Sequence, residues 1–323
     1  MNTFKWLLKR EFWEHKGGFF WLPIVVGAIM TGFIALSLLI VSLGMKSDME
    51  INGVAVSSLA DIVSTEQKAE FASRLVDGYA GLTMPILIAL SIAVFFFCLG
   101  ALYDERKDRS VLFWKSLPLS DAAIVLSKVA MALLVAPVIA LVVAVVTAVV
   151  AGFMICAAAA VAGVNIFGAV LGNPDTYLAP LQLTGVMPIY ALWALPTIGW
   201  LLMVSAWART KPLLWAIGVP IMTGILLTWI NAMFQFGWNM GWFWKNIIAR
   251  LLASGLPGTW LGGHEPIMRS GEALHTSSAI SEMSEIFSHS WQVLAAPGIW
   301  IGVAVGAAMI YVAIRQRGWR DEG

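Results

Sequence analysis

The side chains that could take part in recognition or chemistry are concentrated in one short charged segment. Six of the seven residues from Asp104 to Ser110 are charged, and both signs are mixed within them. An apolar stretch that includes Phe113 and Trp114 follows directly. Mixed charge of this kind is typical of a surface that docks another protein, because complementary charges select the partner. We interpret the segment as a short helix with a polar docking face and an aromatic anchor. The alternative is an ordinary solvated loop.

The sequence lacks the common motifs for metal binding, cysteine redox chemistry and nucleotide binding. Cys98 and Cys156 lie far apart in apolar stretches without a Cys-x-x-Cys spacing, so we interpret them as buried small hydrophobes. His264 precedes a glutamate but lacks the second helical histidine of a zinc protease. The sequence also has no Gly-x-x-x-x-Gly-Lys-Ser/Thr loop for nucleotide phosphates. We therefore expect no catalytic, metal or cofactor site in this chain.

The composition predicts a membrane protein. Hydrophobic residues make up 59% of the 323 residues and charged residues only 12%, whereas soluble domains carry roughly 25% charged residues. The apolar residues come in blocks of about 20 or more, the length at which a helix crosses a hydrocarbon core of about 30 Å. A net charge of +1 provides no basic field for nucleic acid. We expect an all-α polytopic membrane protein with a single transmembrane domain over residues 1–323.

Six apolar blocks are long enough to cross a bilayer. The first exceeds the apolar region of about 7–15 residues found in a signal peptide, so we interpret it as a span. A further apolar stretch, 155–171, is short and interrupted by glycine, and we expect an extension or a re-entrant piece there. The predicted spans are 19–44, 80–102, 124–152, 186–207, 212–232 and 294–314.

The basic residues predict the orientation of the spans. With the N-terminus in the cytoplasm, 14 of the 20 basic residues fall on the cytoplasmic side. The positive-inside rule then puts both termini and segment 103–121 in the cytoplasm. Segments 45–79 and 233–293 are extracytoplasmic. Tryptophan and phenylalanine gather near the start of the second, which favours short interfacial or re-entrant helices on the outer face over a mobile loop.

Residues 1–18 predict an interfacial helix that leads into the first span. Phe4, Leu7 and Phe12 share one helical arc beside a cluster of lysines, although Glu11 interrupts that arc. The alternative is a polar tail with incidental aromatic residues.

Ionisable side chains are absent from the interior of the predicted spans. Lys128 lies near the cytoplasmic end of the third span, where we expect it to snorkel to the interface. Ion-coupled carriers, voltage sensors and intramembrane hydrolases need such groups at depth. Any uphill transport by this protein would therefore take its energy from another chain.

Small residues recur at every fourth position of the third span, and glycines do so in the last span. Such ridges let helices approach closely where lipid offers no hydrophobic drive. The sequence leaves open whether the contacts lie within one subunit or between subunits. The predicted packing residues are Ala132, Ala136, Ala140, Ala144, Ala148, Gly152, Gly298, Gly302 and Gly306.

The run Tyr-Asp-Glu-Arg-Lys-Asp-Arg-Ser, followed by Phe-Trp-Lys-Ser-Leu-Pro-Leu-Ser-Asp, resembles the cytoplasmic segment of bacterial ABC-2 type permeases. These are the membrane subunits of ATP-binding-cassette exporters. The six spans, the amphipathic N-terminus and the long outer segment agree with that family. The resemblance implies a coupling helix in a groove of a separate ATPase subunit. Its residues would be Tyr103, Asp104, Glu105, Arg106, Lys107, Asp108, Arg109, Ser110 and Phe113.

The resemblance also implies a function. The chain would be a non-catalytic permease subunit in the bacterial cytoplasmic (inner) membrane, in contact with membrane lipid. It would pair with a second permease subunit and with two copies of an ABC ATPase that bind ATP and Mg. The implied activity is export of an amphipathic or hydrophobic substrate, such as a peptide, an antibiotic or a lipid-like molecule. The alternative is a non-transporting scaffold or sensor that docks a cytoplasmic partner.

Overall fold

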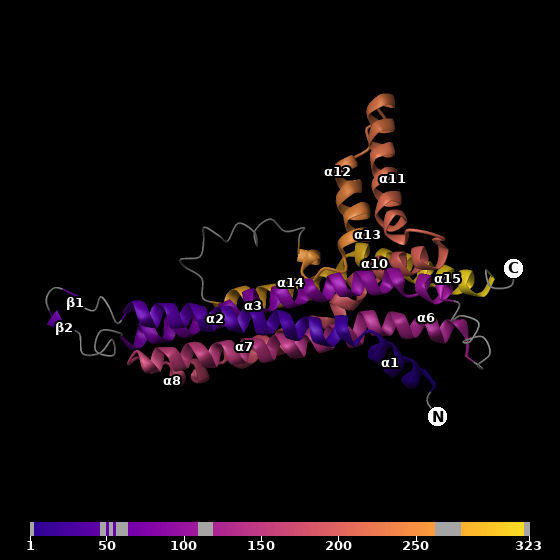
Figure 1. Ribbon diagram of the computed structural model, residues 1–323. Coiled ribbons are helices and arrows are strands. Elements are labelled where there is room, and N and C mark those ends of the chain that lie inside the picture. Colours follow the sequence, from indigo (N-terminus) through magenta and orange to yellow (C-terminus); the bar gives the residue numbers. More distant parts are fainter. Residues whose placement is uncertain are drawn as a thin grey trace.

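The computed structural model describes residues 3–45, 50–51, 54–55, 64–108, 119–261 and 279–319. Nearly all of this part of the chain is helical, and most of the long helices run along one elongated bundle (Figure 1). The N- and C-termini lie at the same end of the bundle, which we call the terminal end, and the opposite end is the distal end. An even number of crossings requires this arrangement.

Six helical segments are long and apolar enough to cross a membrane, so the chain is a multi-pass membrane protein. Each of them overlaps one predicted span, and the prediction of an all-helical protein with six such segments is confirmed. The six segments are Gly17–Leu43, Gly81–Lys107, Asp121–Val161, Thr176–Trp207, Pro212–Phe234 and Pro297–Gly318.

The long helices that build these segments are α2 (Leu22–Met45), α3 (Thr65–Gly100), α6 (Asp121–Ala130), α7 (Ala136–Val161), α10 (Met187–Trp207), α11 (Pro212–Phe234) and α15 (Pro297–Trp319). The shorter α-helices are α1 (Thr3–Glu14), α4 (Tyr103–Lys107), α8 (Phe167–Gly172), α9 (Asp175–Gly185), α12 (Met240–Phe243), α13 (Ala249–Ala253) and α14 (Ala279–Gln292). Turns of π-helix are η1 (Gly17–Trp21), η3 (Met131–Val135) and η4 (Trp244–Ile248). Turns of 3-10 helix are η5 (Thr259–Leu261) and η7 (Val293–Ala295). Strands β1 (Glu50–Ile51) and β2 (Val54–Ala55) pair antiparallel.

Helix α3 and the segment Asp121–Val161 are both much longer than a bilayer is thick. The 36 residues of α3 span about 54 Å at ~1.5 Å per residue, against a hydrocarbon core of about 30 Å. The helix begins at a capping box, in which the Ser64 side chain accepts from the Gln67 N–H and the Ser64 N–H donates to Gln67 Oε1. The last part of segment 45–79 is therefore a helical extension of the second span.

The apolar stretch 155–171 does not add a seventh span. Its first part continues α7 as far as Val161. The chain then turns at Gly163, which has φ of 91°, and the short helix α8 packs beside α3. The prediction that this stretch extends an existing span is confirmed for residues up to Val161.

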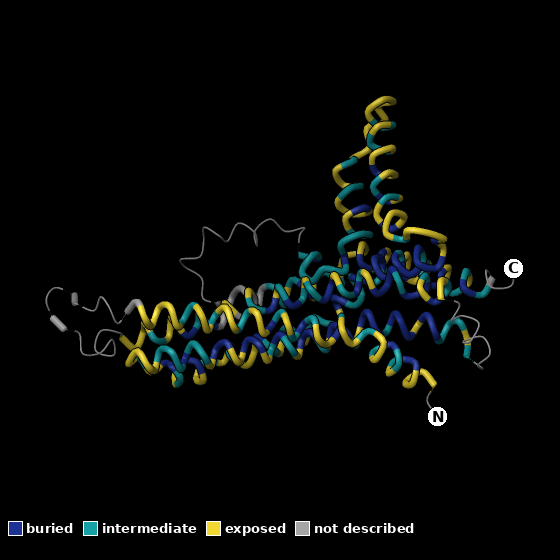
Figure 2. Tube along the Cα trace, in the orientation of Figure 1, coloured by how far each residue is buried: buried dark blue, intermediate teal, exposed yellow. Residues whose placement is uncertain are grey.

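Helix α11 projects sideways from the bundle, and α12, η4 and α13 return beside it (Figure 1). Most residues of α11 are exposed (Figure 2). Side chains of the bundle hold the returning part of this helical hairpin by donating hydrogen bonds to its backbone carbonyls. Thr197 donates to the Arg250 carbonyl at 3.0 Å, and the hydroxyls of Ser91 and Tyr190 donate to the Gly255 carbonyl at 3.0 and 3.1 Å. The later part of the aromatic run after α11 thus forms the short helical turns α12 and η4, which pack against α11, and α13 packs against α10.

The small residues of the third span face the protein interior. All six of them, from Ala132 to Gly152, are buried, and α7 packs along α2 and α3. An exposed row on the opposite side of α7 includes Val138, Val142 and Val146, as expected for a lipid-facing surface. This ridge therefore mediates packing within one chain.

In the last span, Gly306 lets α15 approach α10 closely, and Gly302 leaves room for the Arg250 side chain of α13. A Cβ at Gly306 would lie 2.8 Å from the Leu195 carbonyl carbon, and a Cβ at Gly302 would lie 2.7 Å from Arg250 Cζ. By contrast, the nearest atom to a Cβ at Gly298 is an Arg250 nitrogen at 3.8 Å. Only the last two glycines are thus required by contacts within the chain.

We expect Gly306→Ala to destabilise the protein by about 1–3 kcal/mol, because the added methyl group must displace the backbone of α10. The control Gly298→Ala meets no atom closer than 3.8 Å and should change stability by less than about 0.5 kcal/mol. Thermal unfolding of both variants in detergent micelles measures the difference. Equal midpoints for the two variants would contradict the close packing of α10 and α15.

Candidate functional site

A buried network of charged side chains lies at the terminal end of the bundle. The Lys128 ammonium of α6 is 2.9 Å from Glu11 Oε1 of α1 and 2.9 Å from Glu105 Oε1 of α4. The relative exposure of Lys128 is 2% and that of Glu11 is 0%. One lysine therefore joins helices that are far apart in sequence.

The network continues from Glu105 to the last span. Arg317 of α15 donates to Glu105 Oε2 through Nη1, and its Nε donates to Asp121 Oδ1 at 3.0 Å. Asp121 is the first residue of α6, which has Ser120 as its N-cap. The five side chains thus link α1, α4, α6 and α15, and their two cations balance most of the charge on three carboxylates.

The short helix α4 is also bonded to the end of α10. The N–H groups of Leu102 and Tyr103 both donate to Ser205 Oγ at 3.0 Å. Arg106 donates to the carbonyl oxygens of Ser205 and Ala208, the second at 3.0 Å. These bonds satisfy backbone groups that a helix end leaves without partners. The inner face of α4 is thereby held by α6, α10 and α15.

The outer face of α4 is free to meet another molecule. Asp104, Lys107 and Asp108 are exposed. A polar cavity of about 250 Å³ lies beside them, and Arg10 and His15 contribute to its walls. The arrangement presents a charged helix at the surface of the described part of the chain.

The predicted coupling residues divide between the two faces of α4. Glu105 and Arg106 bind inward, and Tyr103 is half-buried. Asp104, Lys107 and Asp108 are exposed. The other predicted coupling residues, Arg109, Ser110 and Phe113, lie outside the described residues, as does His264.

Two expectations about single charges are wrong. Lys128 does not snorkel, because its ammonium is buried between two carboxylates. Glu11 is not a break in an apolar face of α1, because it is the buried partner of Lys128. Lys128 stands alone among apolar neighbours in the sequence, and that isolation was the available signal, whereas Glu11 lies among other charged residues and gave none. A lone charge among apolar neighbours indicates a partner elsewhere, since burial without one is costly.

One group in this region has the ligand types of a metal site. The side chains of Glu11, Glu14 and His15 have ligand atoms within 4.8 Å of one another. However, Lys128 already neutralises Glu11, and Arg10 Nε is 3.2 Å from Glu14 Oε1. The two cations occupy the carboxylates that a metal ion would need, so we assign no metal to the group.

A comparison with protein-family models, curated proteins and solved structures found no match for this chain.

Proposed function

We propose that this chain is the permease subunit of an ATP-driven ABC-2 type exporter. In this role the exposed face of α4 docks a separate ATPase subunit, and movement of α4 is transmitted to the spans. The observation that carries the proposal is the mounting of α4. Its outer face is charged and exposed, while its inner face is tied by ion pairs and hydrogen bonds to α1, α6, α10 and α15.

Coupling requires that a force on the exposed face of α4 reach the membrane spans, and the bonds on its inner face provide that connection. A force on Asp104 or Lys107 acts on a helix whose neighbouring residue, Glu105, binds both Lys128 and Arg317. Displacement of α4 therefore shifts the ends of the third and sixth spans together. Packed interfaces of this kind change between discrete arrangements rather than deforming smoothly.

The proposal includes a partner set and a location. Two copies of the ATPase would bind ATP and Mg, and a second permease subunit, identical or related, would complete the path in a bacterial inner membrane. The substrate would be amphipathic or hydrophobic, because the spans offer apolar surface almost throughout. The terminal end would face the cytoplasm, in line with the excess of basic residues there.

Cysteine labelling tests the orientation. Val161, at the distal end of α7, is 88% exposed, and Arg209, between α10 and α11, is exposed. We expect a membrane-impermeant maleimide to label Val161→Cys in intact cells and Arg209→Cys only after permeabilisation. The native Cys98 and Cys156 are buried and give little background. Labelling of Arg209→Cys from outside would show that the orientation is the reverse of the proposed one. The α4 face would then lie outside the cell, where no ATPase subunit could dock.

The function is tested by purifying the chain from its native membrane in mild detergent and reconstituting the complex in liposomes. We expect a Walker-motif ATPase to copurify in equal amount and ATP to drive movement of an amphiphilic cargo. A stable complex without ATP-dependent movement would support a scaffold or sensor instead.

A further inference from the structure

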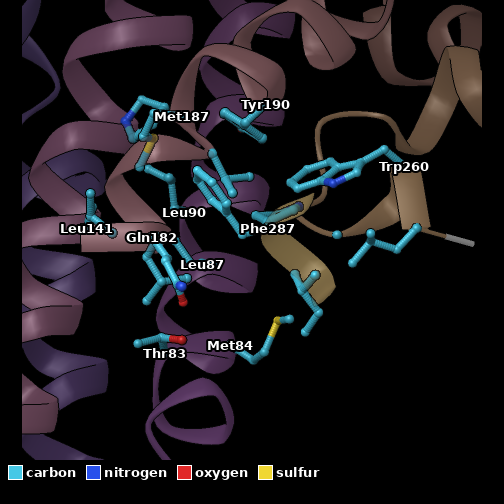
Figure 3. A pocket seen from close by; sticks show the side chains of 17 residues that line it. Thr83, Met84, Leu87, Leu90, Leu141, Gln182, Met187, Tyr190, Trp260 and Phe287 are labelled. Carbon is cyan, nitrogen blue, oxygen red and sulfur yellow. The ribbon is translucent and has the colours of Figure 1, made fainter. Parts of the chain in front are cut away.

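An apolar cavity of about 120 Å³ lies between the spans and the segment that follows α13. Its walls come from α3, α7, the junction of α9 with α10, η5 and α14. Figure 3 shows Trp260 and Phe287 on one side of the cavity, with Leu90 and Met187 on the other. Six separate elements therefore meet around one apolar space.

Tyr190 and Trp260 line the cavity, but their hydrogen-bond donors are used by groups outside it. The Tyr190 hydroxyl donates to the Gly255 carbonyl at 3.1 Å, and Trp260 Nε1 donates to Ser290 Oγ at 2.9 Å. These residues consequently offer the cavity their rings and not their donors. Thr83 and Gln182 supply the other polar side chains of the lining, and both lie toward the same end of it in Figure 3.

The cavity is lined by three of the membrane-spanning segments. Leu90, Leu141 and Tyr190 stand about 17 to 20 residues from the terminal ends of their spans, which corresponds to roughly 25–30 Å along a helix. A hydrocarbon layer of about 30 Å that begins at those terminal ends would therefore end near the cavity. Trp260 and Phe287 line the cavity at this level.

We propose that this cavity binds the hydrocarbon tail of an amphiphile, with the polar head toward Thr83 and Gln182. A dry apolar cavity of about 150 Å³ accommodates benzene, so the space takes an aromatic ring or the last few carbons of an acyl chain. Met84 and Met187 line the cavity, and methionine adapts to groups of different shape. The tail comes from a membrane phospholipid or from a free single-chain amphiphile. The site does not depend on ATP-driven transport.

Photo-crosslinking tests the site and distinguishes the two sources. The chain is reconstituted in vesicles of phosphatidylglycerol and phosphatidylcholine that contain phosphatidylcholine with a diazirine at the end of one palmitoyl chain. In a second arm, diazirine palmitate is added to unlabelled vesicles. We expect adducts at residues 257–261 or at Phe287 in at least one arm. Labelling in the first arm alone identifies a phospholipid tail, and labelling in the second identifies a free amphiphile.

Leu87→Trp places an indole in the cavity and should lower the yield of these adducts roughly tenfold, because it fills the space of the tail. The matched control is Ile88→Trp on the next residue of α3, which is 46% exposed and should leave the yield unchanged. Met187→Trp replaces Leu87→Trp if that variant does not fold. Adducts confined to exposed residues such as Val142, or equal yields in the filled and wild-type proteins, would overturn the proposal.

Discussion

Lys128→Met is expected to lower the free energy of unfolding by about 3–5 kcal/mol, since it removes one partner of a buried ion pair. Methionine nearly conserves the volume of lysine, so packing changes little and the loss is electrostatic. The change leaves Glu11 buried without its cation, and Glu105 with only Arg317. Denaturant titration of the purified protein in micelles measures the effect.

Two controls separate this effect from general damage. Lys107→Met removes an exposed lysine at the end of α4 and should change stability by less than about 0.5 kcal/mol. Adding Glu11→Gln to Lys128→Met should restore part of the loss, because a neutral amide is cheaper to bury than an unpaired carboxylate. If Lys107→Met and Lys128→Met unfold alike, the buried network does not stabilise the protein.

The pH dependence of Lys128→Met gives an independent check. A carboxylate that is buried without a cation binds its proton more tightly in the folded state than in the unfolded state. The folded state of the variant should therefore take up protons preferentially, and its stability should rise as the solution is acidified from about pH 8 to about pH 5. The wild-type protein, whose carboxylates are paired, should not gain stability in this range.

Reversing the exposed charges of α4 is expected to abolish coupling to the ATPase without unfolding the chain. In Asp104→Lys/Lys107→Glu/Asp108→Lys, each charge that meets the partner changes sign. Charges of like sign across an interface cost several kcal/mol, so substrate-stimulated ATP hydrolysis should fall by about tenfold or more. The measurement is ATP hydrolysis by the reconstituted complex, together with the yield of copurified ATPase.

The matched control for this variant reverses an exposed pair near the distal end of the bundle. Glu70 and Arg74 of α3 are 2.7 Å apart and exposed, and Glu70→Lys/Arg74→Glu should leave hydrolysis unchanged. Arg106 is unsuitable for this test, because it bonds the carbonyls that end α10 and its loss would lower stability by itself. Normal hydrolysis by the α4 variant would disprove the docking site.

The membrane-spanning architecture was predictable because it depends on local properties of the sequence. Hydrophobic blocks long enough to cross a bilayer set the number of spans, and all six agree with the structure to within five residues at their terminal ends. The third and second spans extend far beyond the predicted distal limits, to Val161 and from Thr65. The extension of α3 is polar and carries no hydropathy signal, whereas that of α7 is apolar and continues the hydrophobic block, so hydropathy marks neither limit.

The charged segment itself was also evident from the sequence, but its two faces were not. Composition makes Asp104, Glu105 and Arg106 equivalent. The structure separates them, since Glu105 reaches Lys128 and Arg317 while Asp104 remains exposed. Which side of a five-residue helix is buried depends on the helices that surround it, and no pattern within five residues contains that information.

The sequence by itself determined that this protein crosses a membrane, where its spans lie and which segment is charged. Only the tertiary structure decided which charges are partners. Lys128 and Glu11 are 117 residues apart along the chain, and Arg317 and Glu105 are 212 apart. Hydropathy is a sum over neighbouring residues, whereas an ion pair depends on where distant helices end. That difference is the physical reason why the sequence marks Lys128 as an isolated charge but does not identify Glu11 and Glu105 as its partners.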